Sequence, residues 1–257
     1  MTMRRRIARY GWAPDLPDQR DHMFAAPPPV LGVLPPKVDL RPQCPPVVDQ
    51  GDLGSCTANA IANAHRFDQI KEGAKDHFIP SRLFIYYNER SMEGTIKSDA
   101  GAQIRDGVKS IAQLGVCPEA LWPYDITKFA KKPLVKTYTE ALKHQALSYQ
   151  RVVRDINQMK GCLAAGYPFV FGFTVYESFE SDQVAKDGLM PMPKPKEKCL
   201  GGHAVLAVGY DDATQRVTVM NSWSDKWADK GFFYMPYDYI ASAKLADDFW
   251  TIRTVEA

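Results

Sequence analysis

Residues 49–58 read DQGDLGSCTA, which places Gln50 six residues before Cys56 at the start of a helical pattern. Apolar side chains then recur at helical spacing to about residue 72, and Gly73 follows as a stop signal. At a helix amino terminus, beside a cationic partner, the pKa of a thiol falls from about 8.5 to about 3.5–7.5. We therefore predict that Cys56 is a nucleophile in its thiolate form.

Two later segments contain the partners that such a nucleophile needs. His203 lies inside the apolar strand pattern GGHAV, and Asn221 begins the tripeptide NSW that ends at Trp223. Taken singly, such residues are more often a core cysteine, a hydrogen-bonded core histidine or a turn asparagine. Their order along the chain favours catalysis, because His203 follows Cys56 by 147 residues, within the roughly 130–150 residues of papain-type enzymes.

In this order the chain resembles the papain-like cysteine peptidases, from about residue 34 to about residue 236, and it is most similar to bacterial members of the xylellain type. The resemblance implies an α+β fold of two lobes with the active-site cleft between them. A helical lobe is expected at about residues 47–145, and an antiparallel β-rich lobe at about residues 146–257.

Local patterns agree with this division. A helical face at residues 104–114 is capped by Gly115, and Asp155 is a candidate cap for a short helix that ends near residue 166. Strand patterns follow at residues 169–175, 204–210, 216–220, 232–235 and 249–254.

The resemblance also implies a role for each site residue. Cys56 attacks the peptide carbonyl, and His203 protonates the leaving amine and later activates water. Asn221 orients the imidazole, while Trp223 shields that contact from solvent. Gln50 and the backbone amide of Cys56 form the oxyanion hole. No metal or organic cofactor is needed.

Two glycines join Trp223 as predicted substrate-binding residues. Gly101 resembles the position whose backbone pairs with extended substrate, and a glycine there permits close approach. Gly202 stands where the family often borders its second specificity pocket. Because Gly202 has no side chain, the specificity of this pocket cannot be inferred from other members of the family.

The first 36 residues are rich in proline and charge, and we expect a propeptide-like extension before a peptidase domain at residues 37–257. Contacts from Tyr10, Trp12 or Met23 could hold this segment in the cleft and regulate access to it. The alternative is a disordered or surface-packed tail. Residues 7–16 lack the apolar core of a Sec signal peptide, so we expect a cytoplasmic protein or export by another route.

Composition narrows the function classes. The 257 residues are 45% hydrophobic and carry a net charge of +2, which gives no reason to invoke nucleic acid, and no apolar run is long enough to span a membrane. Besides Cys56 the chain has four cysteines without zinc spacing. A reducing compartment is the simpler interpretation, although two disulfides among the four stay open.

We therefore predict an endopeptidase that hydrolyses peptide bonds of peptide or protein substrates through a thioester acyl-enzyme. One alternative is a transpeptidase or amide transferase with the same triad, in which an amine replaces water. The other is a catalytically silent binding protein on the same fold.

Overall fold

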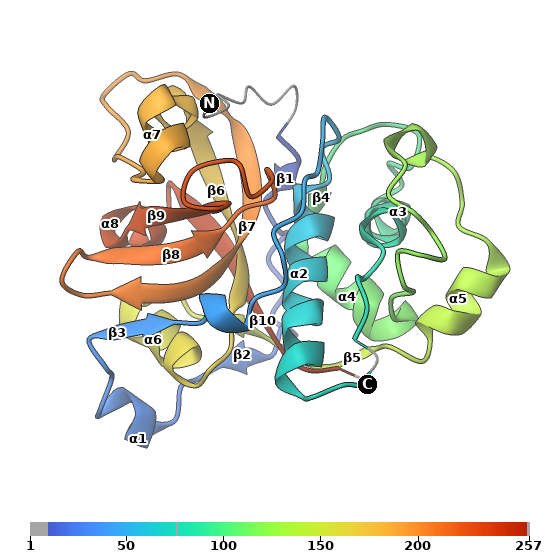
Figure 1. Ribbon diagram of the computed structural model, residues 1–257, viewed down its shortest axis with the longest axis horizontal. Helices are drawn as coiled ribbons and strands as arrows, with labels where there is room; N and C mark the ends of the chain where they lie inside the picture. The colour runs from blue at the N-terminus through green and yellow to red at the C-terminus, as the bar shows by residue number, and fades with distance from the viewer. Residues whose placement is uncertain (1–9, 76, 256–257) are drawn as a thin grey trace.

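The computed structural model describes residues 10–75 and 77–255 and has two lobes, one helical and one β-rich (Figure 1). The α+β fold expected from the sequence is confirmed. The helices of the first lobe are α2 (Cys56–Lys71), α3 (Arg82–Met92), α4 (Ile104–Leu114) and α5 (Val135–Ala141). The chain also has the short helices α1 (Pro28–Leu31), α6 (Ile156–Ala164), α7 (Asp182–Asp187) and α8 (Tyr237–Ala241). Single 3-10 turns lie at Arg41–Gln43, Ile126–Lys128 and Glu177–Glu180.

An eight-stranded sheet forms the second lobe, with the order β2-β5-β10-β6-β7-β8-β9 and β3 paired to β7. Apart from the parallel pair β2 and β5, neighbouring strands in it are antiparallel. The strands are β2 (Met23–Phe24), β3 (Lys37–Asp39), β5 (Ala146–Val152), β6 (Phe169–Tyr176), β7 (Cys199–Asp211), β8 (Arg216–Met220), β9 (Phe232–Pro236) and β10 (Ala246–Val255).

Helix α2 lies on the side of the helical lobe that faces the sheet, and it contacts β7 and β10 as well as α3 and α4 (Figure 1). Most of its side chains are buried, including small residues such as Ala58 and Ala62 that allow close packing. Because its first residue is Cys56, the helix brings the thiol against strand β7 of the other lobe.

Most elements predicted from local patterns are confirmed. Helices α2 and α4 begin and end within a residue of the expected positions, and the Asp155 side chain caps α6 by accepting the Gln158 N–H at 2.9 Å. Helix α3 was not predicted. Its apolar residues are interrupted by buried polar groups such as Glu89 and Arg90, whose place in the core depends on tertiary contacts.

The N-terminal segment has more structure than the sequence indicated. Its first strand, β1 (Trp12–Ala13), runs parallel to β4 (Ala102–Gln103), and β2 joins the main sheet beside β5. Phe24 and Ala26 belong to the hydrophobic core. The part of the predicted extension at residues 1–9 lies outside the described residues, and the boundary at residue 36 stays a prediction.

Two general features bear on the function classes. Within residues 10–75 and 77–255, no helix has the length and apolar character required to cross a bilayer. All five cysteines are free thiols. Cys199 is exposed, Cys44 is partly buried, and Cys56, Cys117 and Cys162 are buried.

Candidate active site

Cys56 is the first residue of α2, and its side chain is fully buried. The loop before it is held by Asp99, whose carboxylate accepts the Gly54 N–H at 3.1 Å. Three backbone amides hydrogen-bond to the sulfur: those of Thr57, of Ala204 in β7 and of Gly11 in the N-terminal segment. The thiol therefore contacts three parts of the chain: the next residue of α2, strand β7 of the opposite lobe and the N-terminal segment.

His203 lies in β7, next to Ala204, and is fully buried. Its Nε2 lies 2.8 Å from Oδ1 of Asn221, which follows strand β8. The antiparallel pairing of β7 with β8 brings these residues together. The same Oδ1 accepts the Ser222 N–H at 2.8 Å, so the asparagine presents its oxygen, and the imidazole must donate through Nε2.

Aromatic rings surround the imidazole. The Trp223 ring centroid lies 5.1 Å from that of His203, with 30° between the planes, and the indole is 2% exposed. Phe173 from β6 and Tyr10 from the N-terminal segment each approach the imidazole edge-on, with centroids 5.7 Å away. This shell keeps water from the contact between His203 and Asn221.

Gln50 is buried beside the same loop. Its Nε2 donates to the backbone oxygen of Leu53 at 3.1 Å, and its Oε1 accepts from the Ser222 hydroxyl at 2.6 Å. The Gln50 backbone N–H donates to the Ser222 oxygen at 2.9 Å. Ser222 therefore orients both Gln50 and Asn221, which the sequence did not indicate.

The N-terminal segment occupies the space in front of Cys56. The backbone oxygen of Gly11 accepts the Ala102 N–H at 2.8 Å, while the Gly11 N–H points to the sulfur. Of the three contact residues expected from the sequence, Tyr10 and Trp12 lie at the site. Met23 does not, because it pairs with β5 and is largely exposed.

Both predicted substrate-binding glycines face this segment. Gly101 has φ +76°, and a Cβ there would lie 2.1 Å from the Gly11 oxygen. At Gly202 a Cβ would lie 2.6 Å from the Trp12 ring. The close backbone approach expected at Gly101 is thus made by the chain's own N-terminal segment, and the role of these glycines toward substrate stays a prediction.

The protonation of the thiol differs from the sequence-based expectation. Burial raises the pKa of Cys56 to about 12, despite the three amide donors. Glu89, fully buried behind the helix and hydrogen-bonded to Thr57 at 2.7 Å, adds a smaller effect in the same direction. Burial under the N-terminal segment therefore opposes the thiolate that the sequence predicts, and a standing thiolate stays a prediction.

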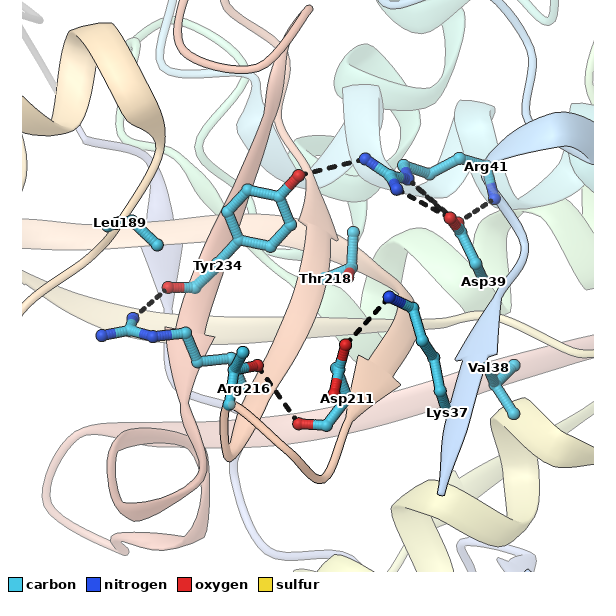
Figure 2. Close-up of a pocket in the computed structure, with 10 residues that line it drawn as sticks. Lys37, Val38, Asp39, Arg41, Leu189, Asp211, Arg216, Thr218 and Tyr234 are labelled. Atoms are coloured by element: carbon cyan, nitrogen blue, oxygen red, sulfur yellow. Dashed lines mark hydrogen bonds and ion pairs between the residues drawn. The ribbon is translucent and has the colours of Figure 1, made fainter. Parts of the chain in front are cut away.

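A pocket lies away from these residues, between β3, β8 and β9 (Figure 2). Its charged side chains pair with one another, since Lys37 lies 2.9 Å from Asp211, and Arg41 lies 2.7 Å from Asp39. Arg216 donates to two backbone oxygens, of Met190 and Tyr234. Because these cations are already compensated, we assign the pocket no ligand.

The model of the papain family of cysteine proteases matches residues 34–250. The chain belongs to this family. It is therefore a papain-like cysteine peptidase, as the sequence predicted, and such enzymes act on peptide substrates.

Comparison with individual proteins supports the same family. Xylellain, a cysteine protease from Xylella fastidiosa, is 45% identical with a TM-score of 0.90, and the match covers 99% of each chain. The uncharacterized peptidase C1-like protein L477 of Acanthamoeba polyphaga mimivirus is 48% identical, covering 85% of this chain and 73% of the relative. A procathepsin B from Trypanosoma congolense, 17% identical with a TM-score of 0.74 over 93% of this chain and 84% of its own, shares the fold.

Proposed function

We propose that this peptidase is an endopeptidase that works through a thioester acyl-enzyme, and that residues 10–13, here called the plug, inhibit it by occupying the cleft. One observation carries the proposal. The N–H of Ala204 reaches the Cys56 sulfur while the neighbouring His203 is held by Asn221 at 2.8 Å, so thiol and imidazole converge from opposite lobes.

The chemistry follows from these positions. Because Nε2 of His203 donates to Asn221, Nδ1 is the ring nitrogen that exchanges a proton with the thiol. The Cys56 thiolate adds to the peptide carbonyl, and the C–N bond breaks as the imidazolium protonates the amine. Water, deprotonated by the imidazole, then cleaves the thioester.

Gln50 is the proposed side-chain donor to the oxyanion. Its Nε2 is engaged with the Leu53 oxygen while the plug is bound, and its Oε1 is held by Ser222. A substrate oxygen beside Cys56 would take up Nε2 with little movement of the buried side chain. Preorganised donors of this kind need no reorientation during the reaction.

The plug is not placed for cleavage. It presents the Gly11 N–H to the sulfur, and its Gly11 carbonyl oxygen is bound by the Ala102 N–H and not by the proposed oxyanion donors. A tethered peptide has an effective concentration of order mM, which keeps a groove occupied even when its contacts are weak. These observations support inhibition by occupancy.

The test uses an internally quenched peptide library blocked at both termini, with products identified by mass. An endopeptidase cleaves internal bonds of such peptides, and the Cys56→Ala protein does not. Transfer to an added amine in place of hydrolysis would favour the transferase alternative. A folded protein that neither cleaves the library nor traps an acyl-enzyme, even after plug removal, would refute the proposal.

A further inference from the structure

The N-terminal segment has two parts with different contacts. The plug, residues 10–13, lies over Cys56. The anchor, residues 15–36, runs along both lobes and leads to β3. Pro14, which is exposed, joins the two parts.

The anchor contributes a buried ion pair with the helical lobe. Asp21 and Arg105, near the start of α4, are 6% and 5% exposed. The guanidinium donates to the carboxylate through two nitrogens, with Nη2 at 2.6 Å and Nε at 3.1 Å. Arg105 also donates to the backbone oxygen of Leu16, so its guanidinium is hydrogen-bonded to two anchor residues, and it lies 5.8 Å from the centroid of the Trp250 ring.

A second anchor carboxylate, Asp15, is completely buried. It accepts the Arg105 backbone N–H at 3.0 Å and the Trp250 indole N–H at 2.8 Å, which joins α4 to β10. The Asp15 backbone N–H donates to Asp248 at 2.8 Å. Arg151 of β5 closes the cluster, 2.9 Å from Asp248 and 3.5 Å from Asp21.

The remainder of the anchor is part of the fold. Phe24 and Ala26 are 3% and 4% exposed, and the Ala26 N–H donates to Gln158 of α6 at 2.8 Å. Near the other end, the Tyr210 hydroxyl donates to the Pro35 oxygen at 2.6 Å. Losing the anchor would leave two arginines without these carboxylates, an indole N–H without an acceptor and the β5 edge uncovered.

The plug makes fewer buried polar contacts than the anchor. Besides the backbone contacts of Gly11 and the pairing of β1 with β4, the plug donates hydrogen bonds from the Trp12 indole to Asp248 at 3.1 Å and from the Tyr10 hydroxyl to Glu180 at 2.6 Å. None of these is a buried ion pair. Displacing the plug therefore exposes far fewer uncompensated groups than displacing the anchor.

We infer that the anchor stays in the active enzyme as a clamp between α4 and strands β5 and β10, and that only the plug leaves the cleft. This inference rests on the proposed function. It implies that the active enzyme is not a chain shortened to about residue 37, because the clamp joins the two lobes whose separation sets the distance between Cys56 and His203.

The experiment compares two shortened proteins, one beginning at Pro14 and one at Lys37. In the Pro14 protein, Cys56 should be alkylated by added reagent, and blocked peptides should be cleaved, at least ~10-fold faster than in the full chain, given the effective concentration of a tethered plug. The melting temperatures of the two proteins should be similar. The Lys37 protein should not fold, or should melt lower by on the order of 10 °C after loss of its buried ion pairs.

Matched substitutions in the Pro14 protein keep the inference testable if the Lys37 protein is insoluble. Asp21→Asn removes one charge of the buried pair and should lower the melting temperature by several degrees. Asp18→Asn is the control, because its ion pairs, with Arg20 two residues away and with Lys109 of α4 at 3.5 Å, are not buried as the Asp21 pair is. Equal melting temperatures for these two variants would overturn the clamp.

A covalent label gives an independent answer. The full-length protein is incubated until activity appears and is then treated with a tagged epoxide that reacts at Cys56. The intact mass of the labelled chains should show that they still include Asp15 and Asp21. Labelled chains that begin near residue 37, or a Lys37 protein as stable and active as the Pro14 protein, would overturn the clamp alone. Absence of Cys56-dependent cleavage in every folded variant would instead refute the proposed function.

Discussion

The backbone N–H of Gly11 donates a hydrogen bond to the sulfur of Cys56. The N-terminal segment thus meets the nucleophile through a donor, where a substrate would offer an electrophilic carbonyl carbon. The contact covers the thiol, and the Gly11 carbonyl oxygen is bound by the Ala102 N–H and not by the proposed oxyanion donors. The hydrogen bond from Gly11 by itself lowers the pKa of Cys56, but desolvation by burial has the larger effect and leaves the pKa raised.

Replacing Cys56 with alanine should abolish peptidase activity and leave the fold intact. Alanine is the best helix former, and the position is the first of α2, so the helix loses little. Cleavage of blocked peptides is measured beside circular dichroism and the melting temperature. Cys162→Ala, which removes a buried thiol of α6, is the matched control and should keep its activity. Activity retained in clean Cys56→Ala protein would rule out Cys56 as the nucleophile.

Gly11→Ala should release the plug. A Cβ at residue 11 would lie 1.8 Å from the Gly54 oxygen, and such overpacking costs about 1–3 kcal/mol, which corresponds to roughly 5–150-fold in plug occupancy. Peptide cleavage and Cys56 alkylation should both accelerate. The control is Gly32→Ala, where a Cβ meets nothing closer than 3.5 Å. Unchanged rates in Gly11→Ala would show that the plug does not limit access.

Alkylation of Cys56 should depend on pH differently with and without the plug. In the full chain burial raises the thiol pKa to about 12, so little thiolate exists near neutral pH and alkylation is slow. Removing residues 1–13 restores solvent and the exchange with His203, which lowers the pKa. The inflection should therefore move to more acidic pH, and turnover should follow a bell with two macroscopic pKa values. Identical inflections in the two proteins would argue against this account.

Gln50→Ala should lower kcat/KM by about 10²–10³, the usual effect of removing one oxyanion donor. Steady-state kinetics of the Gln50→Ala variant, made in the Pro14 protein, measures this loss of kcat/KM. Ser222→Ala is the informative control, because it removes the 2.6 Å hydrogen bond to Oε1 but keeps the Gln50 amide. It should have the smaller effect. If both variants lose the same activity, Gln50 acts only through its contact with Ser222.

Asp68→Asn should flatten the dependence of stability on pH. This α2 carboxylate is buried without a hydrogen bond to either oxygen, and burial, followed by the nearby Glu72, raises its pKa to about 8 against partial compensation from Lys71 and Arg253.

The folded state therefore favours the protonated form of Asp68. Its contribution to stability is complete below the unfolded pKa of about 3.9 and is lost as the pH rises toward about 8. Melting temperatures between about pH 5 and pH 8 should fall more steeply for the native protein than for Asp68→Asn, with a difference of order 5 °C at the upper end. Exposed Asp238→Asn is the control, and parallel curves for native protein and Asp68→Asn would contradict the assignment.

Much of the fold was predictable because the signals are local. The helix that begins at Cys56 follows from apolar spacing and a glycine stop, and strand β8 coincides with its predicted residues 216–220. The order of Gln50, Cys56, His203 and Asn221 identified the family from the chain alone. Their catalytic roles stay predictions, although the structure brings all four to one place.

What only the tertiary structure decided involves residues far apart in the chain. Asp15 lies in the segment that the sequence predicts to be an extension, yet its carboxylate accepts the indole N–H of Trp250, 235 residues away. No local pattern distinguishes a buried aspartate from an exposed one, because burial depends on which distant groups cover it. The same holds for Cys56: its sequence context predicts a lowered pKa, and burial among residues that are distant in the chain raises the pKa by desolvation.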